Sequence, residues 1–200
     1  MKNEILLKKQ GRFFKIIYGK KQFWLPLYFY RSLRDVLTQS VPLKELEKMI
    51  FSLLKERVLF FIGLRDRSEY EIKSYLKRLR QERFERKTLK YLKRLGLLND
   101  RIFGIKFLSY QKSRSLGPYA VKKTMLQKGL KNSLVEEILE KGYTLKEEEQ
   151  LAKKLAKKYV SFKPIKEKKD LVRLINFLKN KGFHNSVIYQ IISIYGNNFF

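Results

Sequence analysis

The sequence predicts a mainly α-helical protein, an elongated array of three tandem three-helix repeats preceded by a small N-terminal β-hairpin plus helices. Three observations support this fold class. Capping residues, glycines and prolines divide most of the chain into short helical segments, one arrangement of helix end and helix start recurs, and strand-like patterning is confined to the first 30 residues. Hydrophobic residues make up 44% of the chain, enough to build a core.

The N-terminal part, residues 1–57, is predicted to form the hairpin and a helical extension. Residues 12–18 and 22–25 are rich in aromatic and β-branched side chains, and Gly19 between them can supply the turn. Pro26 limits the second strand to an edge or to a short length. Because an isolated hairpin is only marginally stable, we expect it to pack on a helix.

Helix signals continue through the rest of the chain. Apolar residues at helical spacing predict one helix over residues 28–39 and a second from Pro42 to about Leu64. Later helix starts are predicted by three capping boxes, Ser68 with Glu71, Ser133 with Glu136 and Thr144 with Glu147. Other predicted limits are helix starts at Asn99 or Asp100, Pro118 and Asn185, and helix ends at Gly96, Gly142 and Gly182.

An internal repeat is visible in the way helices end. Residues 126–135 and 178–188 each contain a helix end, a glycine, an apolar residue, a polar N-cap and an apolar pair. Residues 79–84 form a less regular copy, in which Arg83 stands where the others have glycine. This recurrence predicts stacked helical repeats, which we place at residues 58–103, 104–145 and 146–200.

The chain is very basic, with 46 lysines and arginines against 19 acidic residues, a formal net charge of +27. The charge is spread along the chain, with net values of +8, +7, +5 and +7 over the four predicted segments. Residues 101–135 contain eight basic side chains and no acidic one. A solvated lysine-rich surface would explain the overall charge, but the acid-free segment favours a surface that faces phosphate or an acidic protein.

Residue types disfavour several other classes of protein. The absence of cysteine excludes disulfides, thiolate metal sites and a cysteine nucleophile, and any Ser-His-Asp triad would depend on the single histidine, His184. The sequence has no GxxxxGK[ST] phosphate loop. Its longest apolar run, residues 23–30, is far shorter than the roughly twenty residues of a membrane helix. We expect a cytoplasmic protein with no secretory signal, no membrane association, no metal and no cofactor.

The conspicuous polar and aromatic residues have simple structural explanations. The glutamates at positions 71, 136 and 147 fall in first helical turns, where they cap the helix. Residues 147–149 could form a metal cluster, but acids at a helix N-terminus are far commoner. His184 is interpreted as a turn residue, and Trp24 as packing within the hairpin rather than as a platform for a nucleic-acid base. We therefore expect no enzyme.

Four segments resemble motifs of one known protein family. Residues 66–76 (DRSEYEIKSYL) are similar to the opening of its first repeat, and residues 95–103 (LGLLNDRIF) to a later part of that repeat. Residues 113–129, which contain Gly117-Pro118, resemble the most specific family motif, and residues 178–192 the closing repeat. The family that these segments resemble is RecX, whose members regulate RecA, and the resemblance covers residues 58–195. It implies three tandem three-helix units that bind in the groove of the RecA–DNA filament and restrain ATP hydrolysis, filament growth and strand exchange.

The resemblance and the acid-free segment together suggest where partners bind. We expect a monomer that contacts the RecA filament and single- or double-stranded DNA mainly through its middle repeat, with residues 111–116 forming a mobile, exposed loop. The predicted contact residues are Arg65, Arg67, Lys106, Lys112, Arg114, Lys122, Lys123 and Lys128. The alternatives are a non-specific helical DNA- or RNA-binding protein with no RecA role, or a ribosome-associated factor. The predominance of lysine favours phosphate contacts over base reading.

Overall fold

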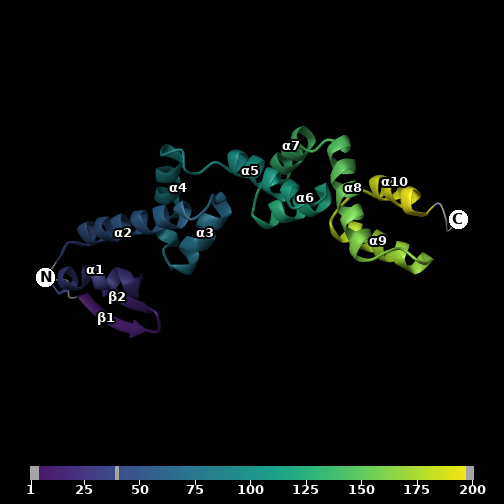
Figure 1. The fold of residues 1–200 in the computed structure, drawn as a ribbon. Helices are drawn as coiled ribbons and strands as arrows, with labels where there is room; N and C mark the ends of the chain where they lie inside the picture. The colour runs from purple at the N-terminus through teal and green to yellow at the C-terminus, as the bar shows by residue number, and fades with distance from the viewer. Residues whose placement is uncertain (1–4, 39–40, 197–200) are drawn as a thin grey trace. The chain divides into compact units, whose positions relative to one another are not determined.

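The computed structural model describes residues 5–38 and 41–196, and it is mainly α-helical, as predicted (Figure 1). The chain divides between Asn99 and Asp100 into two compact units. The first unit begins with a three-stranded antiparallel sheet of β1 (Ile5–Gln10), β2 (Phe13–Tyr18) and β3 (Lys21–Pro26). Within the described ranges, no helix is both long enough and apolar enough to cross a membrane.

The sheet confirms the predicted hairpin and adds a strand to it. β2 and β3 pair around Gly19, which has a φ of 56°, and Pro26 lies on an edge strand. β1 pairs with the other side of β2, so the sheet has the order β1-β2-β3. Sequence reasoning missed β1 because Lys8 and Lys9 interrupt the apolar alternation that identifies a strand.

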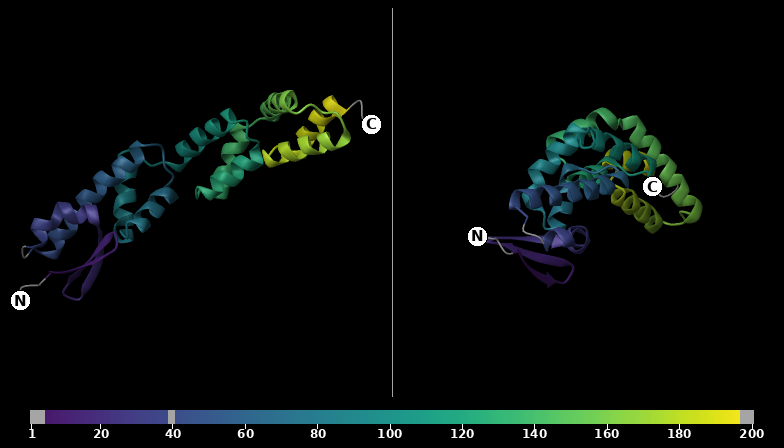
Figure 2. Two further views of the ribbon diagram at one scale, coloured as in Figure 1. Left: turned by 60° about the horizontal axis from the view of Figure 1, so that its bottom comes forward. Right: turned by 90° about the vertical axis from the view of Figure 1, so that its left-hand side faces the viewer.

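One face of the sheet packs against helices (Figure 2). α1 (Leu27–Leu37) contacts β2 and β3 and lies beside α2 (Leu43–Gly63). Ile16, Phe23 and Leu25 share a buried core with apolar residues of these two helices, which supplies the support that the sheet needs. The unit is completed by α3 (Glu69–Arg78), the short 3₁₀ helix η1 (Glu82–Phe84) and α4 (Glu85–Arg94).

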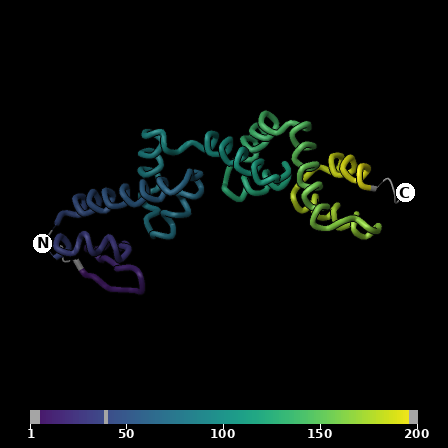
Figure 3. The backbone as a smooth tube through the Cα atoms, in the orientation of Figure 1, coloured from purple at the N-terminus to yellow at the C-terminus, as the bar shows by residue number. Residues whose placement is uncertain are grey.

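The second unit is helical throughout its described part (Figure 3). α5, α6 and α7 surround one apolar cluster, and α8, α9 and α10 surround another. The helices span Asp100–Ser113, Pro118–Gln127, Asn132–Gly142, Leu145–Phe162, Lys168–Asn180 and Asn185–Gly196, in chain order. The predicted segment limits after residues 57 and 103 fall inside α2 and α5, and the division into three repeats stays a prediction.

Two of the three predicted capping boxes are confirmed, at Ser68 before α3 and at Thr144 before α8. The third is wrong. α7 begins at Asn132, one residue before Ser133, and its N-cap residue accepts no side-chain hydrogen bond. The amide of Asn132 instead donates to Glu136 along the helix, at 2.9 Å. A further box, at Glu167 before α9, was missed because a glutamate is an uncommon N-cap.

The turn that ends α3 is formed by Arg80. The comparison of internal repeats, which placed Arg83 at the position of the glycine, was therefore wrong. Arg80 has a φ of 55°, and its N–H and the next one both bond back to carbonyls of α3. The same pair of bonds closes α6 at Gly129 and α9 at Gly182, whose φ values are 78° and 82°. Arg80 thus occupies the position of these glycines, and the buried Phe84 is the last residue of η1.

Candidate nucleic-acid interface

The basic residues of the acid-free segment lie mostly on α5 and α6, and acids from α7 and α8 reach them in space. A bidentate ion pair joins Arg101 to Glu137, with both N–O distances at 2.7 Å. Two further pairs join Lys122 to Glu136 at 3.0 Å and Lys112 to Glu147 at 2.9 Å. The segment is acid-free in sequence but these three cations are partnered in the fold. These ion pairs weaken the case for phosphate contacts at the three side chains, and a phosphate-facing role of the segment stays a prediction.

These pairs hold their carboxyl groups in the charged form. Hydrogen bonds from Arg101 and then Lys141 lower the pKa of Glu137 to about 2. A hydrogen bond from Lys112, followed by one from the backbone of Thr144, lowers the pKa of Glu147 to about 2. In both cases the charged donor stabilises the carboxylate, so the acid stays ionised well below neutral pH.

Lys112 has an internal role. It lies in the last turn of α5, with its side chain 21% exposed, and its ammonium donates to the carbonyl of Gly142 at 2.5 Å as well as to Glu147. A cation at this point satisfies the C-terminal carbonyls of α7. The predicted exposed loop over residues 111–116 is wrong at its start, because α5 continues to Ser113 and Gln111 is buried.

The remaining predicted residues of the middle segment lie nearer to solvent. Lys106 on α5 and Lys123 on α6 are exposed, and Lys128 is half-buried at the end of α6. Arg114 is exposed just beyond α5, with its guanidinium 5.7 Å from the ring centre of Tyr110. The structure therefore gathers six of the eight predicted residues on or beside α5 and α6. Among them, Arg114 and Lys123 combine exposure with no ion pair to any described residue.

Arg65 and Arg67 lie in the first unit, between α2 and α3. Arg65 is exposed and pairs with Glu71 at 2.5 Å, which holds the start of α3. The guanidinium of Arg67 lies 3.9 Å from the ring centre of Phe61 and donates a hydrogen bond to the backbone carbonyl of Phe61. Partial burial lowers the pKa of Arg67. Both arginines stabilise the connection between the helices, and a contact with a partner stays a prediction.

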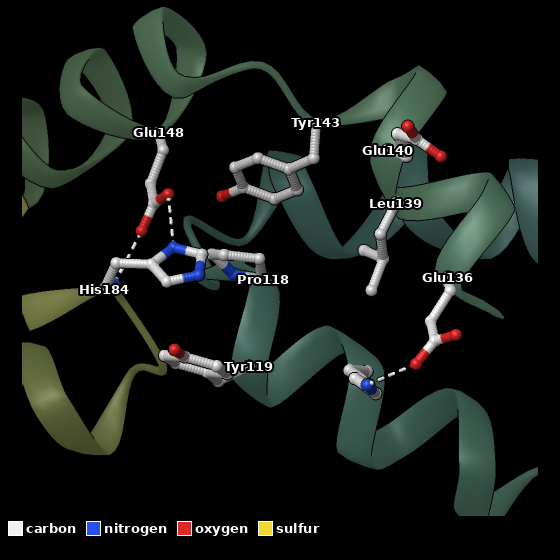
Figure 4. Close-up of a pocket in the computed structure, with 9 residues that line it drawn as sticks. Pro118, Tyr119, Glu136, Leu139, Glu140, Tyr143, Glu148 and His184 are labelled. Atoms are coloured by element: carbon white, nitrogen blue, oxygen red, sulfur yellow. Dashed lines mark hydrogen bonds and ion pairs between the residues drawn. The ribbon is translucent and has the colours of Figure 1, made fainter. Parts of the chain in front are cut away.

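Sequence reasoning missed a pocket of about 360 Å³ in the second unit (Figure 4). The buried Glu148 accepts a hydrogen bond from the backbone N–H of His184 at 2.7 Å, and its second oxygen lies 2.8 Å from Nδ1 of that ring. The ring of Tyr119 lies 4.4 Å from the histidine ring. His184 lies before α10, as predicted for a turn residue, but it is also anchored by a carboxylate 36 positions away.

A close backbone contact lies beside the pocket residues Pro118, Tyr119 and His184 in the sequence. The N–H of Gly117 donates to the carbonyl of Lys181 at 2.8 Å, and the N–H of Tyr119 donates to that of Gly182 at 3.0 Å. A Cβ atom on Gly117 would lie 2.3 Å from the Gly182 oxygen, which is closer than non-bonded atoms can approach, so only glycine fits at this position. The predicted break at Gly117-Pro118 is confirmed, with Pro118 in the first turn of α6. Its glycine also joins the α5–α7 group to the α8–α10 group.

Comparison with known proteins identifies relatives of the chain, although no family model matches it. It is 30% identical over 156 residues to regulatory protein RecX of Streptococcus pneumoniae strain Hungary19A-6, a match that covers 76% of this chain and 60% of that protein. It is 29% identical over 139 residues to regulatory protein RecX of Streptococcus agalactiae serotype V, which covers 67% of this chain and 52% of that protein. The chain thus spans about 60% of the length of the first relative.

Solved structures show the same fold. A crystal structure of a regulatory protein RecX superposes with a TM-score of 0.61 at 24% identity, covering 96% of this chain and 98% of that one. The crystal structure of RecX from Lactobacillus salivarius superposes with a TM-score of 0.63 at 21% identity, covering 73% and 96%. The sequence match over three quarters of the chain, together with the shared fold, supports the predicted resemblance to the RecX family.

Proposed function

We propose that this protein regulates RecA by binding as a monomer in the groove of the RecA–DNA filament, where it mostly inhibits ATP hydrolysis, filament growth and strand exchange. The observation that carries the proposal is the match over 156 residues to relatives named regulatory protein RecX. The spread of the +27 charge supports it, because a protein that follows a nucleoprotein filament needs cations along its length. The proposed role is one of binding, without catalysis.

The proposed mechanism is a shift in the geometry of the filament. Exposed cations beside α5 and α6 contact DNA phosphate or acidic side chains of RecA, while the joined helical groups contact neighbouring RecA subunits. A protein that binds one arrangement of neighbouring subunits better than another increases the population of that arrangement. If the favoured arrangement hydrolyses ATP slowly, turnover falls.

The first experiment measures the ATPase activity of RecA on single-stranded DNA while this protein is titrated in at two salt concentrations. We expect inhibition at fewer than one copy per RecA subunit, because one bound copy constrains several neighbours. The inhibition should weaken at the higher salt concentration, since phosphate contacts depend on counterion release. An unchanged ATPase rate at stoichiometric protein would exclude the proposal.

The second experiment tests the contact residues with a charge reversal that leaves the fold intact. Arg114→Glu with Lys123→Glu is suitable because both side chains are exposed, whereas Lys112 and Lys122 hold internal ion pairs. We expect the half-inhibitory concentration to rise about tenfold. Lys153→Glu with Lys154→Glu makes the same charge change on exposed positions of α8 and serves as the control. If both double variants raised the half-inhibitory concentration equally, Arg114 and Lys123 would not be specific contact residues.

A second candidate function is non-specific binding of DNA or RNA with no RecA role, which the even charge distribution also favours. The ATPase experiment separates the two. Salt-sensitive binding to DNA without any effect on RecA would support this second function.

A further inference from the structure

The outer face of the N-terminal sheet carries an unusual set of side chains. Alternation along the strands sends Ile16, Phe23 and Leu25 into the core and leaves their neighbours on the opposite face. In the register of the sheet, Lys8 pairs with Lys15, and Lys15 pairs with Trp24. These three residues therefore form one row across all three strands, on the face away from α1 and α2.

The row places two lysines side by side in a position that the fold alone does not favour. Like charges directly opposite each other on neighbouring strands repel and destabilise the pair. Residues 5–34 contain no acidic residue and eight basic ones, so no carboxylate of the sheet or of its connections offsets the repulsion. Within the described residues, neither Lys8 nor Lys15 forms an ion pair. A bound anion would offset this repulsion.

A third cation reaches the same face from the turn that ends α3. The guanidinium of Arg80 lies 4.2 Å from the ring centre of Trp24 and 4.9 Å from that of Phe13. The buried Gln81 fixes this placement, because its side-chain amide donates to the backbone carbonyl of Trp24 at 2.6 Å. Arg80 is exposed, so its side chain remains accessible to solvent beside these rings.

The backbone at Arg80 has a conformation that is unfavourable for an arginine. Its φ of 55° lies in the left-handed region, and the corresponding ends of α6 and α9 have glycine there. Glycine would avoid the strain at Arg80, but it would remove the cation from the aromatic face. Strain that the surrounding structure maintains is a common feature of binding sites.

We propose that this face binds single-stranded nucleic acid, with one base stacked on the Arg80–Trp24 pair and the adjoining phosphates bound by Lys8 and Lys15. Bases stack on aromatic rings and on guanidinium planes, and both kinds of surface are present here. The base faces of a duplex are already stacked, so this platform selects the unpaired strand. The proposal is independent of RecA regulation, and Trp24, interpreted from the sequence as hairpin packing, becomes a binding residue.

The test uses Trp24 as its own reporter, because it is the single tryptophan of the chain. The full-length protein is titrated with a 20-nucleotide oligothymidylate, and tryptophan fluorescence is recorded beside the fluorescence anisotropy of a labelled oligonucleotide. We expect saturable quenching that follows the anisotropy curve and weakens as salt is raised. A duplex of the same length should produce little quenching.

Two variants and one control variant locate the site and separate it from folding. Lys8→Gln with Lys15→Gln should lower the affinity about tenfold and reduce the log–log salt slope by about 1.4, at roughly 0.7 per phosphate contact for single strands. Lys153→Gln with Lys154→Gln makes the same charge change on α8 and should leave the affinity within twofold. Arg80→Gly should weaken binding about fivefold while the melting temperature stays equal or rises, because glycine suits the left-handed turn.

Three outcomes would overturn the proposal. One is oligonucleotide binding seen by anisotropy without a change in tryptophan fluorescence, which would place the site elsewhere. Another is equal quenching by duplex and single strand. The third is a loss of RecA inhibition in the Lys8–Lys15 variant with unchanged oligonucleotide affinity, which would assign the face to a protein partner.

Discussion

Single side chains in this protein connect helices that are far apart in the sequence. Lys112 and Glu147 are 35 positions apart, and Glu148 and His184 are 36 apart, yet each pair is in direct contact. Neither contact belongs to a short motif, so the sequence offered no signal for it. Local pairs were easier to predict, because the interaction of Ser68 with Glu71 depends only on the geometry of one helical turn.

The lowered pKa values predict how stability depends on pH. Glu137 and Glu147 titrate in the fold near pH 2, below their ordinary value of 4.5. Their ion pairs therefore contribute stability that is fully present above pH 4.5 and is lost as pH falls through 2. We expect the melting temperature, followed by circular dichroism, to decrease between pH 4.5 and 2.

A variant assigns part of this acid sensitivity to one pair. Lys112→Met keeps most of the packing of the half-buried side chain but removes the charge that lowers the pKa of Glu147. The melting temperature of this variant should be lower at pH 7 and should depend less on pH below 4.5. Lys146→Met, at an exposed position, is the control. Parallel pH profiles for all three proteins would contradict the assigned role of the pair.

At the scale of elements, the sequence was informative where the determinants are local. The β2–β3 hairpin, the breaks at Pro42 and Gly117-Pro118 and two capping boxes were predicted from a few adjacent residues. β1 was missed because a strand that exposes lysines lacks a continuous apolar pattern. The end of α3 was misplaced because an arginine in a left-handed turn has no sequence signature.

Helix ends that share one backbone conformation should differ in their tolerance of a side chain. Gly96 and Gly182 both have positive φ values, but a Cβ on Gly96 would meet nothing within 4 Å, whereas one on Gly182 would lie 2.3 Å from the backbone nitrogen of Ala120. We expect Gly96→Ala to destabilise the protein by about 1 kcal/mol, the cost of the left-handed conformation. Gly182→Ala should cost more than about 3 kcal/mol, because overlap adds to that strain.

Urea unfolding followed by circular dichroism measures this difference. Similar midpoints for the two alanine variants would show that the contact between α6 and the end of α9 is looser than the structure indicates. The same measurement on Gly117→Ala tests the opposite side of the contact, where the overlap is with the Gly182 carbonyl.

At the scale of the whole molecule, the chain consists of separately built units. The sheet and α1–α4 share one apolar cluster, and the second unit contains two clusters of its own. The mainly helical fold class followed from the sequence, because helix signals recur along nearly its whole length. The charge distribution pointed to a polyanionic partner, but it could not show which cations already have acidic partners within the fold.

This organisation predicts that the second unit folds alone. A fragment of residues 100–200 contains both of its clusters and the Gly117–Gly182 contact. We expect it to have a helical circular dichroism spectrum and a cooperative thermal transition. The full chain should then show a transition broader than a two-state fit allows. An unfolded fragment would show that the first unit is required for the stability of the second.

The backbone contact between α6 and the end of α9 has a consequence for amide exchange. First-turn N–H groups have no acceptor in their own helix, so those of Gly117 and Tyr119 would exchange rapidly with water if α6 stood alone. Here both are bonded to carbonyls of Lys181 and Gly182. Their protection therefore exists only while the two helical groups are in contact. Two amides on either side of a proline thus record how often this junction opens, independently of the unfolding of either group.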